Sequence, residues 1–290
     1  MHYLTLLKKA YQTTLKHKFL WIYGIFVASV TGVYMGGNNF SEKDWKDLPF
    51  QKEQVFSFFE QHATILAWSA FGFVLLLMIC GILSLISQGA LISAGAKLNK
   101  DEKTDFHSSL EVGLKHFWRV WGLGIILCLL GFTSLIVLLL PLLFFLASKL
   151  ILLAMVLVVP SILLFIGLTF VLSAAVPYAV RILVLEDKSI FESVASLIKF
   201  AIKNIKQVIL TYLILIATKV VFAIAFMATL LLTGLLLVGI GMAIWSASAQ
   251  IGVIYAVIMS IIYVLATMVV LGAYKAFQSV FLTFVYEKLK

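Results

Sequence analysis

The sequence predicts an all-α polytopic membrane protein: a bundle of six transmembrane helices with amphipathic helices on its cytoplasmic side. Of its 290 residues, 63% are hydrophobic and only 12% are charged, and the mean hydropathy is +1.11. Soluble domains are about half apolar and about a quarter charged, so most of this surface must face lipid. Apolar runs of the roughly 20 residues that cross a bilayer occur six times. A basic amphipathic segment also recurs three times along the chain.

The six apolar runs lie at residues 19–36, 63–86, 121–146, 150–176, 208–234 and 251–274. We expect the first to be a retained span, because a long amphipathic segment precedes it and no clear cleavage site follows. Spans two, four and six are each predicted to continue as a cytoplasmic extension, from Ser87, Ser173 and Tyr274. Short segments around 148–149 and 246–248 predict tight hairpins, which make the flanking spans antiparallel neighbours.

The distribution of basic residues predicts the orientation. Seventeen of the 22 Lys and Arg residues lie in four segments, at 1–18, 97–119, 181–206 and 275–290. Lys and Arg bias short loops to the cytoplasm, so we expect a multi-pass membrane protein with both termini in the cytoplasm. The net charge of +9 then serves orientation and contact with anionic headgroups, and we expect no nucleic-acid partner.

The three amphipathic segments, at 3–16, 104–121 and 189–206, carry an apolar stripe at three- and four-residue steps and a basic side. Such helices can lie in the headgroup plane, or they can pack under the bundle as connectors; the sequence leaves both open. The candidate headgroup contacts are Lys115, Arg119, Lys199, Lys203 and Lys206.

Helix starts follow from the same segments. Ser189 and Glu192 fit a capping box, in which each side chain satisfies a free backbone N–H group, and Thr104 is the equivalent predicted cap.

The segments also suggest an internal repeat, because residues 101–106 resemble residues 186–191. We predict one integral membrane domain over 1–290, built from three two-span repeats about an axis along the membrane normal. The predicted repeats are 1–98, 99–185 and 186–290.

Lys219 is the one ionisable residue predicted to lie deep in a span, with Tyr212 and Thr218 nearby. An intramembrane charge is a candidate functional group: Lys219 could hold an anionic headgroup in a polar cavity, or it could snorkel or rest against backbone carbonyls. Pro141 and Pro160 fit simple kinks better than a broken-helix binding site.

No catalytic motif appears in the sequence, and the five His residues are scattered. We therefore expect no enzyme activity, no cofactor and no metal. The favoured function is contact with membrane lipids, or with partner proteins including further copies of this chain, through the basic helices. The alternative is a transporter or permease for a small or amphiphilic solute.

The lead-in from Leu114 to Gly122 and the stretch from Val184 to Ser193 resemble a broad group of uncharacterised bacterial six-span membrane proteins. That group is similar to the membrane domain attached to some glycerophosphodiester phosphodiesterases. The catalytic barrel of those enzymes, with its metal-site residues, has no counterpart in this sequence. The resemblance implies the architecture and the inner-membrane location, and it implies no activity.

Overall fold

The computed structural model describes residues 2–33, 62–147 and 151–290, and within them the chain is all-α with eight helices. Five helices, α5, α6, α7, α9 and α10, are long and apolar enough to cross a membrane, whereas the apolar part of α2 is shorter. Multiple helices of this kind are those of an integral membrane protein. The helices are α1 (Tyr3–Lys16), α2 (Phe19–Val33), α5 (Ala63–Asn99), α6 (Phe106–Ala147), α7 (Ile151–Glu186), α8 (Ile190–Lys203), α9 (Ile205–Ala247) and α10 (Ala249–Leu289).

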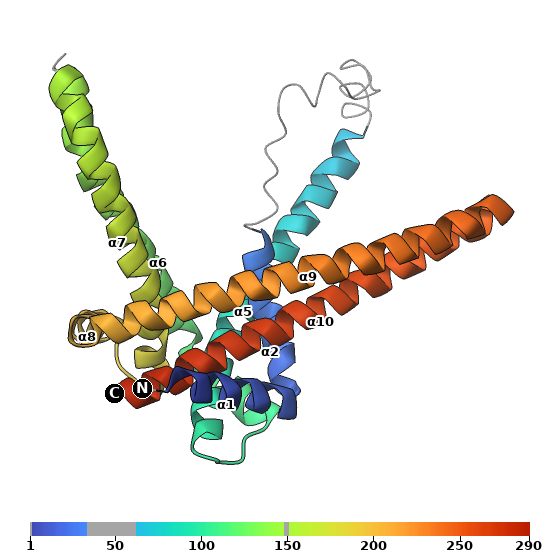
Figure 1. The fold of residues 1–290 in the computed structure, drawn as a ribbon, viewed down its shortest axis with the longest axis horizontal. Coiled ribbons are helices and arrows are strands. Elements are labelled where there is room, and N and C mark those ends of the chain that lie inside the picture. Colours follow the sequence, from blue (N-terminus) through green and yellow to red (C-terminus); the bar gives the residue numbers. More distant parts are fainter. Residues whose placement is uncertain (1, 34–61, 148–150) are drawn as a thin grey trace.

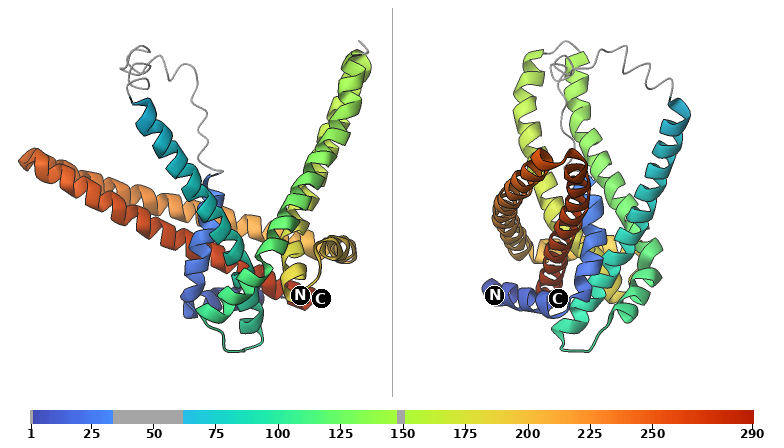
Figure 2. Two further views of the ribbon diagram at one scale, coloured as in Figure 1. Left: turned by 180° about the vertical axis from the view of Figure 1, so that it is seen from behind. Right: turned by 90° about the vertical axis from the view of Figure 1, so that its right-hand side faces the viewer.

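Three arms leave a common base in this structure (Figure 1). One arm is the hairpin α6–α7, the second is the hairpin α9–α10, and the third is the first half of α5. The base holds α1, α8 and both chain termini (Figures 1 and 2). The predicted hairpin at 246–248 is confirmed, because α9 ends at Ala247 and α10 begins at Ala249. The other predicted turn, at 148–149, lies outside the described residues.

The arms are apolar and unburied. No residue in the most apolar window of α9 or of α10 is buried inside the protein, and only 11% of that window is buried in α5. Leu, Ile, Val and Phe side chains account for most of this exposed surface. A contiguous apolar surface of this size marks contact with a membrane or with another protein, and here it extends along the arms.

The base is the core of the molecule, and it is built from the last turns of α5, α7 and α10. Burial begins near Ser84 in α5, near Ala174 in α7 and near Gly272 in α10, and it continues almost to the end of each helix. The prediction that spans two, four and six continue as helices beyond the apolar run is therefore confirmed. Large side chains fill this junction, including Tyr178, Phe281 and Tyr286.

Two glycine contacts allow close approach of helices around the base. A Cβ atom on Gly24 of α2 would lie 1.9 Å from the carbonyl oxygen of Gly272 on α10. A Cβ atom on Gly113 of α6 would lie 2.3 Å from the carbonyl oxygen of Ile86 on α5. Any larger residue must push these backbones apart, so both contacts require glycine.

The helix ends at the base have specific caps. After α5, the N–H groups of Asp101 and Glu102 donate to the carbonyl oxygens of Leu98 and Lys97 at 3.3 and 3.0 Å, which is a Schellman motif. Asp101, at φ 58°, takes the left-handed position that this motif needs, and Asp187 after α7, at φ 49°, is also left-handed.

The predicted capping box at the start of α8 is confirmed, because the N–H group of Ser189 donates to Glu192 Oε2 at 3.0 Å and that of Glu192 donates to Ser189 Oγ at 3.4 Å. At α6 the predicted cap Thr104 is wrong. Asp105 is the cap, since its Oδ1 accepts from the N–H group of Ser108 at 3.4 Å. The hydroxyl of Thr104 instead contacts the hydroxyls of Ser108 and Ser109.

Arg181 is a buried charge at the centre of the base, only 4% exposed. Its Nε donates to Thr283 Oγ1 at 3.2 Å, its Nη2 to the carbonyl oxygen of Ser279 at 2.9 Å, and its Nη1 to the carbonyl oxygen of Pro177 at 2.6 Å. A guanidinium presents its donors in a rigid fork, so these bonds link α7 to α10 in one register.

We predict that Gly24→Ala destabilises the protein by about 1–3 kcal/mol, the usual range for forced overpacking. The added methyl group would collide with the carbonyl of Gly272. Gly81→Ala on α5 is the matched control, because nothing lies within 4 Å of its Cβ position. Thermal unfolding of the detergent-solubilised variants measures the difference; equal melting temperatures would contradict the close contact of α2 with α10.

Candidate functional site

The four segments predicted to be basic gather at one end of the molecule, the base (Figure 2). They comprise α1, the loop and helix start at 97–119, the end of α7 with α8, and the end of α10. Three amphipathic helical stretches form the surface of this end: α1, residues 106–121 of α6, and α8. The site candidates other than Lys219, Tyr212 and Thr218 belong to these stretches or, for Lys206, to the first turn of α9.

The first turns of α6 have three distinct faces. The buried face is formed by Ser109, Gly113, His116 and Val120. The predicted apolar stripe is not the packing face, because Leu114 is 54% exposed and Trp118 is 71% exposed. The third face carries Lys115 and Arg119.

Helices α1 and α8 have the same three faces. In α1 the buried residues are Leu6, Ala10 and Thr14, while Leu4, Tyr11 and Leu15 are exposed. In α8 the apolar stripe predicted from sequence divides in two, because Leu197 packs inward while Ile198 and Ile202 are exposed.

The faces also follow one another in the same order. In each helix a buried residue is followed by an exposed apolar residue and then by an exposed lysine. The three triplets are Thr14-Leu15-Lys16, Gly113-Leu114-Lys115 and Leu197-Ile198-Lys199.

Asp187 neutralises one part of the basic surface. Its carboxylate contacts Lys115 Nζ at 3.1 Å, Arg119 Nη1 at 2.5 Å and His116 Nε2 at 3.1 Å. His116 is 3% exposed, and its Nδ1 lies 2.9 Å from the carbonyl oxygen of Val112. These contacts connect α6 to the left-handed turn between α7 and α8.

The environment of Asp187 lowers its pKa from the ordinary value of 3.8 to about 2. Hydrogen bonds from Lys115 and His116 are the main causes, with the Arg119 contact adding to them. Two of the five predicted headgroup contacts, Lys115 and Arg119, are therefore held by a carboxylate of the same chain.

The lysines of α8 and of the start of α9 have no such partner. In the described part of the chain, Lys199, Lys203 and Lys206 make no ion pair with a carboxylate. Lys199 and Lys203 line a pocket of about 240 Å³ at the junction of α7, α8 and α10. Lys188 and Lys290 line the same pocket, and both already bind Glu186, at 2.7 and 2.9 Å. The pocket therefore has a surplus of positive charge.

The other candidates, Lys219, Tyr212 and Thr218, do not converge on one cavity. Tyr212 packs edge-on against Phe170 at 5.2 Å, and the Thr218 hydroxyl donates to the carbonyl oxygen of Leu215 on its own helix at 2.9 Å. Lys219 is exposed on the surface of α9. A polar transport cavity around Lys219 and a permease function stay predictions that these contacts do not support.

The sequence does not indicate the roles of two central residues, Arg181 and Asp187. Arg181 is one of several basic residues near a span, and Asp187 is one residue of a repeated stretch. Periodicity places residues on one helix but does not show which residue of another helix they will meet. A signal for Arg181 existed in its position four residues after Pro177, within an otherwise apolar stretch.

We predict that Asp187→Asn lowers the melting temperature at pH 7, and that the difference from the unmodified protein disappears in acid. A carboxylate with a depressed folded-state pKa stabilises the fold above its unfolded value, near 3.8, and this contribution is lost as the pH falls through about 2. The difference should be constant from pH 7 to pH 5 and should shrink below pH 4.

Asp101→Asn is the matched control for this experiment. It is the same substitution in the same left-handed conformation, but Asp101 forms no ion pair within the described ranges. Tryptophan fluorescence during heating is the readout. A pH-independent effect of Asp187→Asn would show that the carboxylate charge is not what matters.

Comparison with protein-family models, curated proteins and solved structures gives no match for this chain. The resemblance to six-span bacterial membrane proteins therefore stays a prediction, and the candidate site has to be interpreted from its own geometry.

Proposed function

We propose that this chain is a non-enzymatic, six-span protein of the bacterial inner membrane that binds anionic lipid headgroups through α1, the start of α6 and α8. The observation that carries the proposal is the shared three-face structure of these stretches. Their apolar residues stay exposed although another face is packed against the base. A connector that only packs under the bundle would bury its apolar stripe instead.

An interfacial helix needs an apolar face at the boundary with the acyl chains and basic side chains at the level of the headgroups. In α8 the apolar face is formed by Ile198 and Ile202, and the basic side chains are Lys199 and Lys203. Each Lys or Arg side chain near an anionic surface contributes about 1 kcal/mol to the free energy of binding. Because Lys199, Lys203 and Lys206 have no carboxylate partner among the described residues, their charge is available to lipid phosphates.

The proposed topology places the base and both termini in the cytoplasm and the three arms in the membrane. It is supported by the gathering of the basic segments at one end (Figure 2) and by the positive-inside rule. The proposed repeats 1–98, 99–185 and 186–290 gain support from the left-handed aspartates, Asp101 and Asp187, that follow α5 and α7.

We predict that a fluorophore at position 202 of α8 enters the bilayer interface in anionic nanodiscs. Ile202→Cys in a background without Cys80 and Cys128 places the label on an exposed apolar position. Its emission should shift to the blue, and nitroxide-labelled lipid should quench it. Substitution of the neighbouring lysines, Lys199→Glu with Lys203→Glu and Lys206→Glu, should reduce this quenching severalfold.

Gln207→Cys is the control position, since Gln207 is an exposed polar residue at the start of α9. A label there should stay in water in both neutral and anionic nanodiscs. If position 202 behaves like position 207, or if charge reversal changes nothing, α8 does not bind anionic lipid and the proposal fails.

A further inference from the structure

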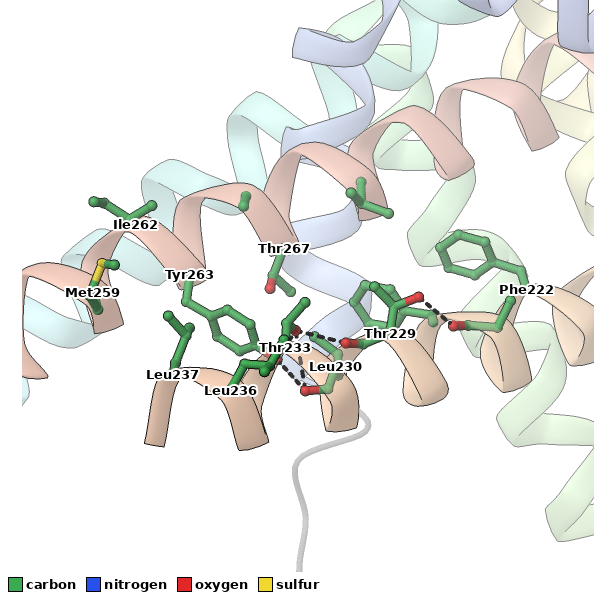
Figure 3. Close-up of a pocket in the computed structure, with 14 residues that line it drawn as sticks. Phe222, Thr229, Leu230, Thr233, Leu236, Leu237, Met259, Ile262, Tyr263 and Thr267 are labelled. Carbon is green, nitrogen blue, oxygen red and sulfur yellow. Dashed lines mark hydrogen bonds between the residues drawn. The ribbon is translucent and has the colours of Figure 1, made fainter. Parts of the chain in front are cut away.

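A groove runs along the α9–α10 arm and is separate from the surfaces considered so far (Figure 3). Its volume is about 530 Å³, which lies within the range of ligand sites, roughly 300–1,000 Å³. The lining is apolar on both helices, from Phe222 to Leu237 on α9 and from Met259 to Val270 on α10. At about 1.5 Å of rise per residue, the α9 lining is roughly 22 Å long.

A few hydroxyl groups interrupt the apolar lining. Tyr263 donates to the carbonyl oxygen of Leu230 at 2.8 Å, and Thr229 donates to that of Ala225 at 2.8 Å (Figure 3). These hydroxyls are satisfied by the helix backbone, so they do not demand a polar ligand. The groove therefore fits a long apolar chain.

The end of the groove nearest the base is aromatic and then basic. Phe222, which lines the groove, stacks on Tyr274 with ring centroids 3.9 Å apart. Lys219 lies one helical turn from Phe222 on α9, and Lys275 follows Tyr274 on α10. Because Phe222 and Tyr274 stack on each other, the two lysines lie at the same level of the paired helices.

Among the described residues, neither Lys219 nor Lys275 forms an ion pair with a carboxylate. Lys275 is half-buried, and a partly desolvated ammonium group beside a second one is costly without an anion. Gln278 Nε2 bonds to the Tyr274 hydroxyl at 2.8 Å and adds neutral polar groups to the same place.

The level of the lysines along the arm agrees with a headgroup position. At 1.5 Å per residue, Lys219 lies about 42 Å from the hairpin end at Ala247, and Lys275 lies about 39 Å from Ala249. A bilayer measures about 40–45 Å with its headgroups. With the hairpin tip and its exposed Trp245 at one interface, both lysines reach the opposite one.

We propose that this groove binds one anionic phospholipid, with an acyl chain between α9 and α10 and the phosphate at Lys219 and Lys275. The acyl chain would fill the apolar groove, and the phosphate would pair with the two lysines, which have no carboxylate partner among the described residues. The site uses none of the residues of α1, α6 or α8 and stands independently of the interfacial helices.

Native mass spectrometry of the full chain, with added phosphatidylglycerol or with phosphatidylcholine of the same acyl chains, tests the site. We expect one phosphatidylglycerol to be retained in preference to phosphatidylcholine. Lys219→Gln with Lys275→Gln should lower this retention on the order of tenfold or more, since charge-assisted bonds to phosphate are lost. Lys219→Arg with Lys275→Arg should preserve it.

Two further variants separate the parts of the proposal. Ala266→Trp fills the groove, which Ala266 lines, and should abolish retention although both lysines remain. Lys199→Gln with Lys203→Gln removes the same charge from α8 and should leave retention unchanged. Loss in this control instead would assign the bound lipid to α8 and overturn the groove site without harming the proposed function.

Other results would also overturn the site. These are equal retention of the two lipids, retention by the double glutamine variant, retention by Ala266→Trp, or dimers of the chain that Ala266→Trp converts to monomers. Each variant is compared only if it elutes as the unmodified protein does. If the double variant does not fold, Lys219→Gln alone is the test of the site, because Lys219 is exposed and its substitution should not disturb folding.

Discussion

The fold depends on the buried guanidinium of Arg181. Taking a cation out of water costs several kcal/mol unless its donors are satisfied. Here the acceptors are two backbone carbonyls and a threonine hydroxyl rather than a carboxylate. Because two of these acceptors, at Ser279 and Thr283, belong to α10, only one register of α7 against α10 satisfies the group. The aromatic packing of Tyr178, Phe200 and Tyr286 is built on that register.

The same junction accounts for the charge that remains on the surface. Glu186 accepts from the Tyr286 hydroxyl at 2.7 Å and pairs with Lys188 and Lys290, while Glu287 accepts from Asn99 at 2.5 Å. Asp187 holds Lys115 and Arg119. These carboxylates are thus committed to joining helix ends, and the lysines of α8 and α9 are left without internal counterions in the described residues.

Composition and periodicity were enough to predict the five long apolar helices, the 246–248 hairpin, the helical extensions and the capping box, because these features depend on neighbours within a few residues. The predicted first span, 19–36, is matched in the described residues only by α2, whose apolar part is shorter. What they could not give was the packing partner. The stripe of α8 divides between Leu197 and Ile202 because the base covers only one side of the helix. Asp105 replaces Thr104 as a cap because its carboxylate reaches the N–H group of Ser108. Lys219 and Lys275 come together only once α9 and α10 are paired.

The order of faces on the basic helices has a geometric consequence. In these helices the buried, apolar and basic faces follow one another in a fixed order around the helix axis. Once the buried face is set against the base and the apolar face against the membrane, the N-to-C direction of the helix is determined. With the buried faces toward the base and the apolar faces toward the membrane, as proposed, α1, the start of α6 and α8 must run around the base in the same sense. That arrangement is what rotation about an axis along the membrane normal produces. The order of buried, apolar and basic residues in Thr14-Leu15-Lys16, Gly113-Leu114-Lys115 and Leu197-Ile198-Lys199 therefore supports the proposed repeat through the burial of these residues.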